Sequence, residues 1–216
     1  MKKIIIFILC SFLSGLGMAC QTETPYSATL TPEPVPSGWS SWLDQPVCGP
    51  PCWQTITPGM TSKEQAVSIL KNTPDVVITY DGQYGLSWDF TNHTDSGEIR
   101  VAEDGVVSTI WLGSISKQKV FLKTVVATYG FPKYVKPYDC REGKCSTALI
   151  YPDSGMFLSV FVSNTGSSRN PRFEILADTV VNRVYFIKQG LENFKKIPDF
   201  QDYDLLTEWQ GYGKYP

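Results

Sequence analysis

Apolar positions along residues 48–187 follow two patterns, the spacing of an amphipathic helix and the alternation of a β-strand. Helical spacing occurs at 66–70, just after a Thr61-x-x-Glu64 motif that predicts a capping box, and again at 120–129. Each helical stretch is followed by β-type runs separated by turn residues. The predicted strands are 76–80, 84–90, 99–102, 106–112, 134–138, 146–151, 156–162, 173–176 and 180–187.

The same order, a helix followed by several antiparallel strands, therefore occurs twice. This repeat predicts an α+β fold of two tandem helix-plus-antiparallel-sheet modules, with helices packed on one sheet face. The first module is expected at 48–113 and the second at 114–187. Residues 188–216 form a C-terminal extension that is rich in aromatic and acidic residues.

The first 19 residues contain two lysines followed by a short apolar run. The run is shorter than the roughly 20 residues of a membrane-spanning helix, so 1–19 is predicted to be a secretory signal peptide. It ends in Leu16-Gly-Met-Ala-Cys20, which is similar to a bacterial lipobox. We therefore expect Cys20 to be lipidated with fatty-acyl chains such as palmitate. The alternative is ordinary cleavage after Ala19, which leaves Cys20 as a free thiol.

Residues 20–47 contain the lipid-attachment cysteine and a stretch of Pro, Thr, Ser and Glu without apolar periodicity. Such a composition favours an extended chain that forms no core, so this segment is predicted to be a tether. The membrane is then one partner, held through lipidated Cys20. The expected location is the extracytoplasmic face of the cell membrane or outer envelope.

Composition narrows the classes of function. The chain of 216 residues has 19 Lys and Arg against 21 Asp and Glu, a net charge of −2, and no basic patch, which argues against nucleic-acid binding. Its single histidine excludes a multi-histidine metal site, and no cofactor is expected. The sequence also lacks G-x-S-x-G, H-E-x-x-H and phosphate-binding glycine motifs.

Four cysteines remain once those of the signal peptide and the lipobox are set aside. Cys48 and Cys52 close a short loop, and Cys140 and Cys145 flank a predicted hairpin turn. Four cysteines allow three pairings, of which pairing within each short loop is the most economical. Structural disulfides are expected outside the cytoplasm, and zinc bound by the four sulfur atoms is the alternative.

Two groups of polar side chains are candidates for a catalytic role. His93 lies in a polar loop, where a surface position is much more common than a general base, so no catalytic residue is assigned. An acidic cluster near the C-terminus would suit a cation site or the paired acids of a glycosidase, but a solvated face is favoured. Its members are Asp199, Asp202, Asp204 and Glu208.

Aromatic residues are abundant, with 6 Trp, 11 Tyr and 11 Phe. Those in predicted strands, such as Trp88 and Trp111, are expected to be core residues. In the C-terminal extension, Trp209, Tyr212 and Tyr215 are interspersed with glycines and are the candidate ligand-binding residues. Packing of these rings against the sheet is favoured, and stacking on a glycan or peptide ligand is the alternative.

Three motifs carry a resemblance to known proteins. The segment 56–66, Ile-x-Pro-Gly-Met-Thr-x-x-Glu-x-Ala, with the hairpin end at 103–107, resembles the SmpA/OmlA family of small envelope lipoproteins and the tandem repeats of the β-lactamase-inhibitor-protein-like fold. Residues 129–135 are similar to the Gly-x-Pro segment that ends the helical part of such repeats. Residues 51–59 resemble uncharacterised bacterial surface lipoproteins. The resemblance implies a binding or scaffolding role and no catalytic residue.

These features predict a bacterial lipid-anchored lipoprotein with a non-catalytic binding or scaffolding role in the cell envelope. Its expected partner, besides the membrane, is an envelope protein or a glycan. The alternative is a surface glycan-binding protein or hydrolase that acts on cell-wall polymers. Carboxylates about 5 to 10 Å apart on the floor of an aromatic cleft would favour the hydrolase, and an open sheet face would favour binding.

Overall fold

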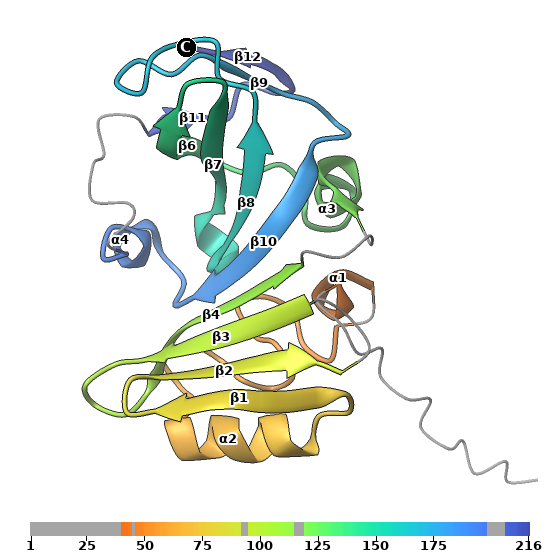
Figure 1. Ribbon diagram of the computed structural model, residues 1–216, viewed down its shortest axis with the longest axis vertical. Helices are drawn as coiled ribbons and strands as arrows, with labels where there is room; N and C mark the ends of the chain where they lie inside the picture. Colours follow the sequence, from red (N-terminus) through yellow and green to blue (C-terminus); the bar gives the residue numbers. More distant parts are fainter. Residues whose placement is uncertain (1–39, 45, 92–94, 115–118, 198–205) are drawn as a thin grey trace, which may run out of the picture. The chain divides into compact units, whose positions relative to one another are not determined.

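The computed structural model describes residues 40–44, 46–91, 95–114, 119–197 and 206–216 (Figure 1). The strands are β1 (Val76–Gly82), β2 (Gly85–Phe90), β3 (Asp95–Val101), β4 (Val107–Ser114), β5 (Val120–Phe121), β6 (Tyr134–Arg141), β7 (Lys144–Tyr151), β8 (Met156–Val162), β9 (Phe173–Ile175), β10 (Val180–Ile187), β11 (Thr207–Glu208) and β12 (Gly213–Tyr215). The α-helices are α1 (Ser41–Asp44), α2 (Lys63–Asn72), α3 (Leu122–Tyr129) and α4 (Leu191–Phe194), and a 3₁₀-helix spans Pro152–Ser154.

Ten of the strands form one antiparallel sheet. Its order is β1-β2-β3-β4-β10-β8-β7-β6-β11, and the short β5 also pairs with β10. The strands β9 and β12 form a separate two-stranded sheet. Among the described residues, no helix has both the length and the apolar composition needed to cross a bilayer.

The predicted fold class of two helix-plus-sheet modules is wrong. Strand β10 pairs with β4 on one side and with β8 on the other, so the hydrogen-bonded ladder continues across the expected module boundary. The helices are also short, with 10 residues in α2 and 8 in α3. The protein is therefore mostly antiparallel β-sheet. The alternation of residues along a strand specifies its buried face but not its neighbour, so the repeat pattern could not show this pairing.

Helix α2 begins one residue later than the motif predicts. Ser62 is the N-cap: its side chain accepts a hydrogen bond from the Gln65 backbone N–H, and the Gln65 side chain accepts one from the Ser62 N–H. The Thr61 hydroxyl oxygen instead accepts the backbone N–H of Thr57 at 2.8 Å. The predicted capping box of Thr61 and Glu64 is therefore wrong by one position.

One face of the large sheet carries the main core. On this face, Leu112 of β4 and Val184 of β10 are direct partners in the ladder and are fully buried. Helices α2 and α3 contribute their apolar sides to the same core. Trp53, in the loop before α2, is also buried here and stacks on Trp88 of β2, with the ring centroids 5.2 Å apart.

The opposite face is covered over one part of the sheet. Over β7 and β8, a smaller core forms between Ala148, Ile150 and Phe157 of the strands and Phe194 of α4. Over β2, β3, β4 and β10, side chains of the same face line a groove. This uncovered area is called the open face below.

Candidate ligand-binding groove on the sheet

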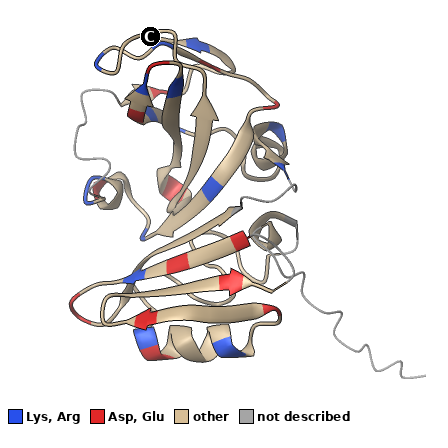
Figure 2. Cartoon of the chain, viewed as in Figure 1, with Lys and Arg blue, Asp and Glu red and all other residues tan. Residues whose placement is uncertain are grey.

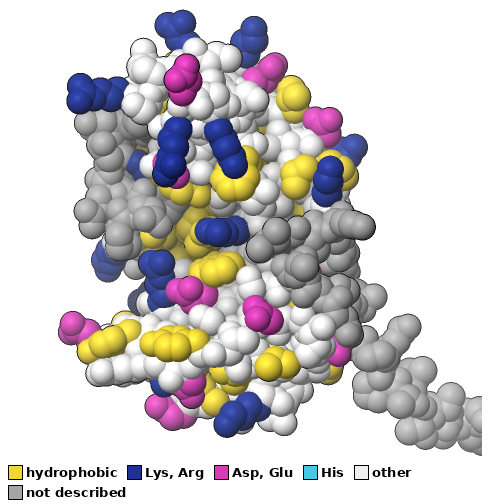
Figure 3. Space-filling view, in the orientation of Figure 1, with side chains coloured by type: hydrophobic (Ala, Val, Ile, Leu, Met, Phe, Trp, Pro, Cys, Tyr) yellow, Lys and Arg dark blue, Asp and Glu magenta, His cyan; other side chains and the backbone are white. Residues whose placement is uncertain are grey.

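A groove with a volume of about 1300 Å³ lies on the open face. Strands β2, β3, β4 and β10 form its floor, and residues of α4 and the segment just after it line one side. In Figure 2, acidic and basic positions both occur on the strands of this sheet. In the space-filling view of Figure 3, Lys and Arg side chains lie beside hydrophobic ones on the visible face. The groove therefore combines charged and apolar surface.

The antiparallel register places side chains of the groove in a row across the strands. The row consists of Ser87, Glu98, Trp111, Tyr185 and Phe157, each the direct partner of the next. Because directly opposed residues of a sheet point to the same face, all five lie on one face of the sheet. The first four line the groove, and Phe157 is buried in the smaller core. The ring of Tyr185 stacks on that of Phe157, with centroids 4.1 Å apart, so one face of Tyr185 is covered.

Arg183 lies beside this row on β10. Its guanidinium is 5.1 Å from the centroid of the Trp111 ring, and Nη1 donates a long hydrogen bond of 3.5 Å to the Tyr185 hydroxyl. Burial opposes its charged form, but the hydrogen bond with Tyr185 and electrostatic interactions with Tyr185, Tyr138 and Glu98 leave the pKa of Arg183 above its ordinary value. No carboxylate of the described residues forms a salt bridge with it.

Gly113 of β4 permits this position of Arg183. The two residues are direct partners in the ladder. A Cβ atom at position 113 would lie 3.0 Å from Arg183 Cγ and 3.2 Å from the Trp111 ring, closer than ordinary van der Waals contact. The glycine therefore leaves the room in which the arginine side chain crosses the sheet toward Trp111.

Two more aromatic rings line the groove from the β1–β2 hairpin. Tyr80 and Tyr84 are each 58% exposed. The Tyr84 hydroxyl accepts a hydrogen bond of 3.0 Å from the side chain of Gln83. Contiguous exposed aromatic surface in a hollow is typical of interaction sites, whereas single exposed rings are common.

Glu98 is the one carboxylate on the floor strands among the described residues that line the groove. Its Oε1 lies 3.4 Å from Nε of Arg100 on the same strand. The other two acids of the lining, Glu103 and Asp104, lie in the turn between β3 and β4. The described floor thus holds a single carboxylate, which pairs with an arginine.

The predicted ligand-binding aromatics lie elsewhere. Tyr215 of β12 is buried and stacks on Phe173 of β9, with centroids 5.5 Å apart. Trp209 and Tyr212 lie against Phe131, which is 62% exposed. Tyr215 is therefore a packing residue. Trp209 is half-buried and packs against the main core as well as against Phe131, while Tyr212 is exposed beside them. None of these residues lines the groove.

Both cysteine pairs of the described chain form disulfides within their own loops. Cys48 is joined to Cys52, and Cys140 is joined to Cys145. Cys140 and Cys145 are direct partners at the end of the β6–β7 hairpin, with Cα atoms 4.0 Å apart. Among the residues that the structure describes, no three His, Cys, Asp or Glu side chains are grouped to hold a metal ion.

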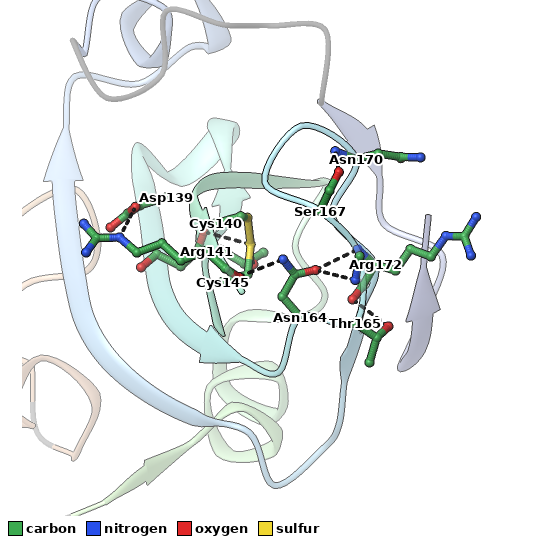
Figure 4. The surroundings of a disulfide bond; sticks show 12 residues. Asp139, Cys140, Arg141, Cys145, Asn164, Thr165, Ser167, Asn170 and Arg172 are labelled. Carbon is green, nitrogen blue, oxygen red and sulfur yellow. Dashed lines mark hydrogen bonds and ion pairs between the residues drawn. A yellow bond between two sulfur atoms is a disulfide. The ribbon is translucent and has the colours of Figure 1, made fainter. Parts of the chain in front are cut away.

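Asn164 connects the second disulfide hairpin to the loop before β9 (Figure 4). Its Nδ2 donates to the carbonyl of Arg141 at 3.0 Å. Its Oδ1 accepts the backbone N–H groups of Gly166 at 2.9 Å and Arg172 at 3.0 Å. This buried amide satisfies three backbone groups, which is a structural role.

Several predicted residues lie outside the described parts of the chain: Cys20, His93, Asp199, Asp202 and Asp204. Glu208, the remaining member of the acidic cluster, lies on β11 and is exposed.

The groove does not follow from the pattern of residues in the sequence. Trp88 is buried in the core as expected, but Trp111 is half-buried and lines the groove instead. The run 106–112 is nearly all apolar or β-branched, so its alternation is weak and does not reveal which residues face outward. Arg183, a charge inside the apolar run 180–187, was the available signal for a functional face.

Comparison with known proteins adds one distant structural likeness. No protein-family model matches the sequence, and no curated protein matches it. Among solved structures, the chain is similar to the crystal structure of a DUF4309 family protein, YjgB, from Bacillus subtilis subsp. subtilis str. 168, with a TM-score of 0.40 and 11% identity. The match covers 62% of this chain and 83% of that one. At this TM-score the likeness carries no argument about fold or function.

Proposed function

We propose that this protein is a bacterial lipoprotein, anchored through Cys20 to the extracytoplasmic side of the envelope, that binds a ligand non-catalytically in the groove. The observation that carries the binding role is the groove itself: a hollow of about 1300 Å³ with exposed aromatic rings and Arg183 on its floor. Ligand sites in proteins are typically hollows of about 300–1,000 Å³ that combine apolar or aromatic lining with a few polar groups.

Two other observations support the location. The lipobox-like segment is followed by a stretch rich in Pro, Thr, Ser and Glu, a composition that favours an extended chain suited to holding a folded domain away from a bilayer. The last part of the predicted 20–47 tether does not fit this role, because Trp42 and Leu43 of α1 are buried in the main core. The disulfides Cys48–Cys52 and Cys140–Cys145 also favour an exported protein, because disulfides persist in oxidising compartments and are rare in the cytosol.

The anchor is tested by metabolic labelling with a fatty-acid analogue in the native host. The wild-type protein is expected to incorporate label, and Cys20→Ala is expected to lose it, since the acyl chains need that thiol. Cys10→Ala, which removes the other cysteine of the leader region, is the matched control and retains the label. Label that persists in Cys20→Ala contradicts the anchor.

The groove is tested by placing a photoreactive phenylalanine analogue at single positions and irradiating intact cells. At Tyr84, inside the groove, a crosslinked product of higher mass is expected. At Leu176, which is 48% exposed and lies outside the groove, no such product is expected. A product at Phe131 without one at Tyr84 would move the binding site to the C-terminal aromatic cluster and contradict the proposal.

A further inference from the structure

We infer that the ligand of the groove is a saccharide that carries carboxylate groups, with Arg183 binding one carboxylate and the exposed rings stacking on the sugar. This inference rests on the proposed function, since it names the ligand class of the same groove.

Arg183 offers hydrogen-bond donors without a carboxylate partner. Its guanidinium has five N–H groups, of which one is used within the described structure, in the bond to Tyr185. Its direct partners on the neighbouring strands are Gly113 on β4 and Ser159 on β8, so neither cross-strand neighbour is acidic. Contact with Trp111 holds the guanidinium over the floor.

A guanidinium held in this way suits a carboxylate better than a neutral group. Arginine binds a carboxylate through two parallel N–H···O bonds, which adds both strength and a defined orientation. Glu98, the carboxylate of the floor, interacts electrostatically with Arg183 but forms no salt bridge with it, and its ion pair is with Arg100. The carboxylate for Arg183 therefore comes from the ligand.

The strand pairing argues against a peptide bound by main-chain hydrogen bonds. Each floor strand, β2, β3, β4 and β10, is already paired on both sides, so the floor has no free strand edge. A peptide cannot add to it as another strand. Recognition must therefore use side chains that point out of the sheet.

Those side chains are suited to sugars. Tyr80 and Tyr84 expose ring area, and the electron-rich face of an aromatic ring attracts the polarised C–H groups on the flat side of a sugar. Ser87 and Thr109 place hydroxyl groups in the same lining, where they can exchange hydrogen bonds with sugar hydroxyls. Rings and hydroxyls together match the alternating apolar and polar faces of a saccharide.

The charges of the lining limit the density of acid groups on the ligand. Among the described residues, the groove is lined by four cations, Arg100, Arg183, Lys188 and Lys196, and by three acids, Glu98, Glu103 and Asp104. The difference is one positive charge, in a protein whose net charge is −2. A saccharide in which acidic units alternate with neutral ones fits this balance better than a dense polyanion.

The test measures binding by calorimetry with the full lipoprotein in detergent micelles. The probe is a hyaluronan octasaccharide, in which glucuronate alternates with a neutral N-acetyl sugar. Its carboxyl methyl ester is the matched neutral probe. The wild type is expected to bind the acid about tenfold or more tightly than the ester, because the ester cannot form a charge-assisted pair with Arg183.

Two variants and one control assign the contacts. Arg183→Gln is expected to weaken binding of the acid about tenfold or more and to remove the preference over the ester. Tyr84→Ala is expected to weaken both probes by a similar factor, because stacking does not depend on the charge. Lys214→Gln, on β12 outside the groove, removes an exposed cation without changing the preference. All three positions are exposed, so unchanged melting temperatures verify folding.

The inference is overturned if the wild type binds acid and ester equally, binds neither, or binds a sulfated oligosaccharide without carboxylates or an oligoglutamate peptide in their place. These results remain distinct from failure of the proposed function. A crosslinked product at Tyr84 in cells would then show that the groove binds a ligand of another class. If no crosslinked product forms at Tyr84 either, the proposed binding function of the groove is wrong.

Discussion

At the scale of single residues, the start of α2 depends on one hydroxyl group. Ser62 Oγ accepts the backbone N–H of Gln65 at 3.3 Å and donates to the Glu64 carboxylate at 2.9 Å. Its backbone is extended, with φ −73° and ψ 162°, as an N-cap requires. The cap therefore satisfies a helix N–H group and orients a carboxylate toward the positive end of the helix dipole.

We predict that Ser62→Ala lowers the free energy of unfolding by about 1 kcal/mol, because the first turn of α2 loses its cap. Urea unfolding monitored by circular dichroism measures this change. Ser68→Ala is the matched control, since Ser68 is exposed in the middle of the same helix. Its expected effect is within about 0.5 kcal/mol. Equal losses in the two variants would show that the cap has no special role.

A second prediction concerns Glu64. Hydrogen bonds from its own backbone N–H and then from the Ser62 hydroxyl lower the pKa of Glu64 below its ordinary value. Its folded-state pKa thus lies below the unfolded one, so its contribution to stability is present above the unfolded-state pKa and is lost as the pH falls through the folded one. In Ser62→Ala, an NMR titration of the Glu64 carboxyl carbon is expected to move to higher pH. An unchanged titration would exclude the hydroxyl as a cause.

At the scale of elements, the contact between β2 and β3 depends on a glycine. Gly97 is the direct partner of Trp88, and a Cβ atom at position 97 would overlap the indole ring. The indole cannot move aside easily, because it is fully buried and Trp53 stacks on it. Gly97 is required for its lack of a side chain rather than for an unusual backbone angle.

Gly97→Ala is therefore predicted to lower the free energy of unfolding by about 1–3 kcal/mol through overpacking. Gly49→Ala is the control, because nothing lies within 4 Å of a Cβ atom at that position. In chemical denaturation, the double variant Gly97→Ala/Trp88→Leu should lose less stability than the sum of the single variants, since leucine vacates the overlapping volume. Additive losses would rule out this contact.

The residue pattern within each strand determines how much of the fold could be predicted from sequence. In β2, buried Leu86, Trp88 and Phe90 alternate with polar neighbours, so the sequence predicts both the strand and its buried face. In β4, Trp111 stands between buried Ile110 and Leu112, and the flanking positions on its own face, Thr109 and Gly113, are small residues that do not distinguish an outward face from a core face. Its side of the sheet depends on register, which the local pattern does not contain.

At the scale of the whole molecule, β10 joins strands from both halves of the chain. Its two ladders, to β4 and to β8, make one hydrogen-bonded sheet from elements separated by many residues. Apolar residues from α2, α3 and both sets of strands also belong to a single core cluster. Loss of packing in one half is therefore transmitted to the other.

We predict one cooperative unfolding transition. Leu70→Ala, which truncates a fully buried side chain of α2, should cost about 2–5 kcal/mol. Native-state hydrogen exchange should show a similar loss of protection at β2 and at β7, because the most protected amides exchange through global unfolding. Val77→Ala, at a position that is 48% exposed, is the control with a small effect. Unchanged protection at β7 in Leu70→Ala would indicate two independent units.

The sequence by itself determined where most helices and strands lie, because short-range alternation and turn residues act over a few neighbouring positions. It did not determine which strands pair. The local pattern left open which strands flank β10. Long-range packing of the core places it between β4 and β8. The groove depends on the same strand pairing, since Trp111 and Arg183 become neighbours only when β4 and β10 lie side by side.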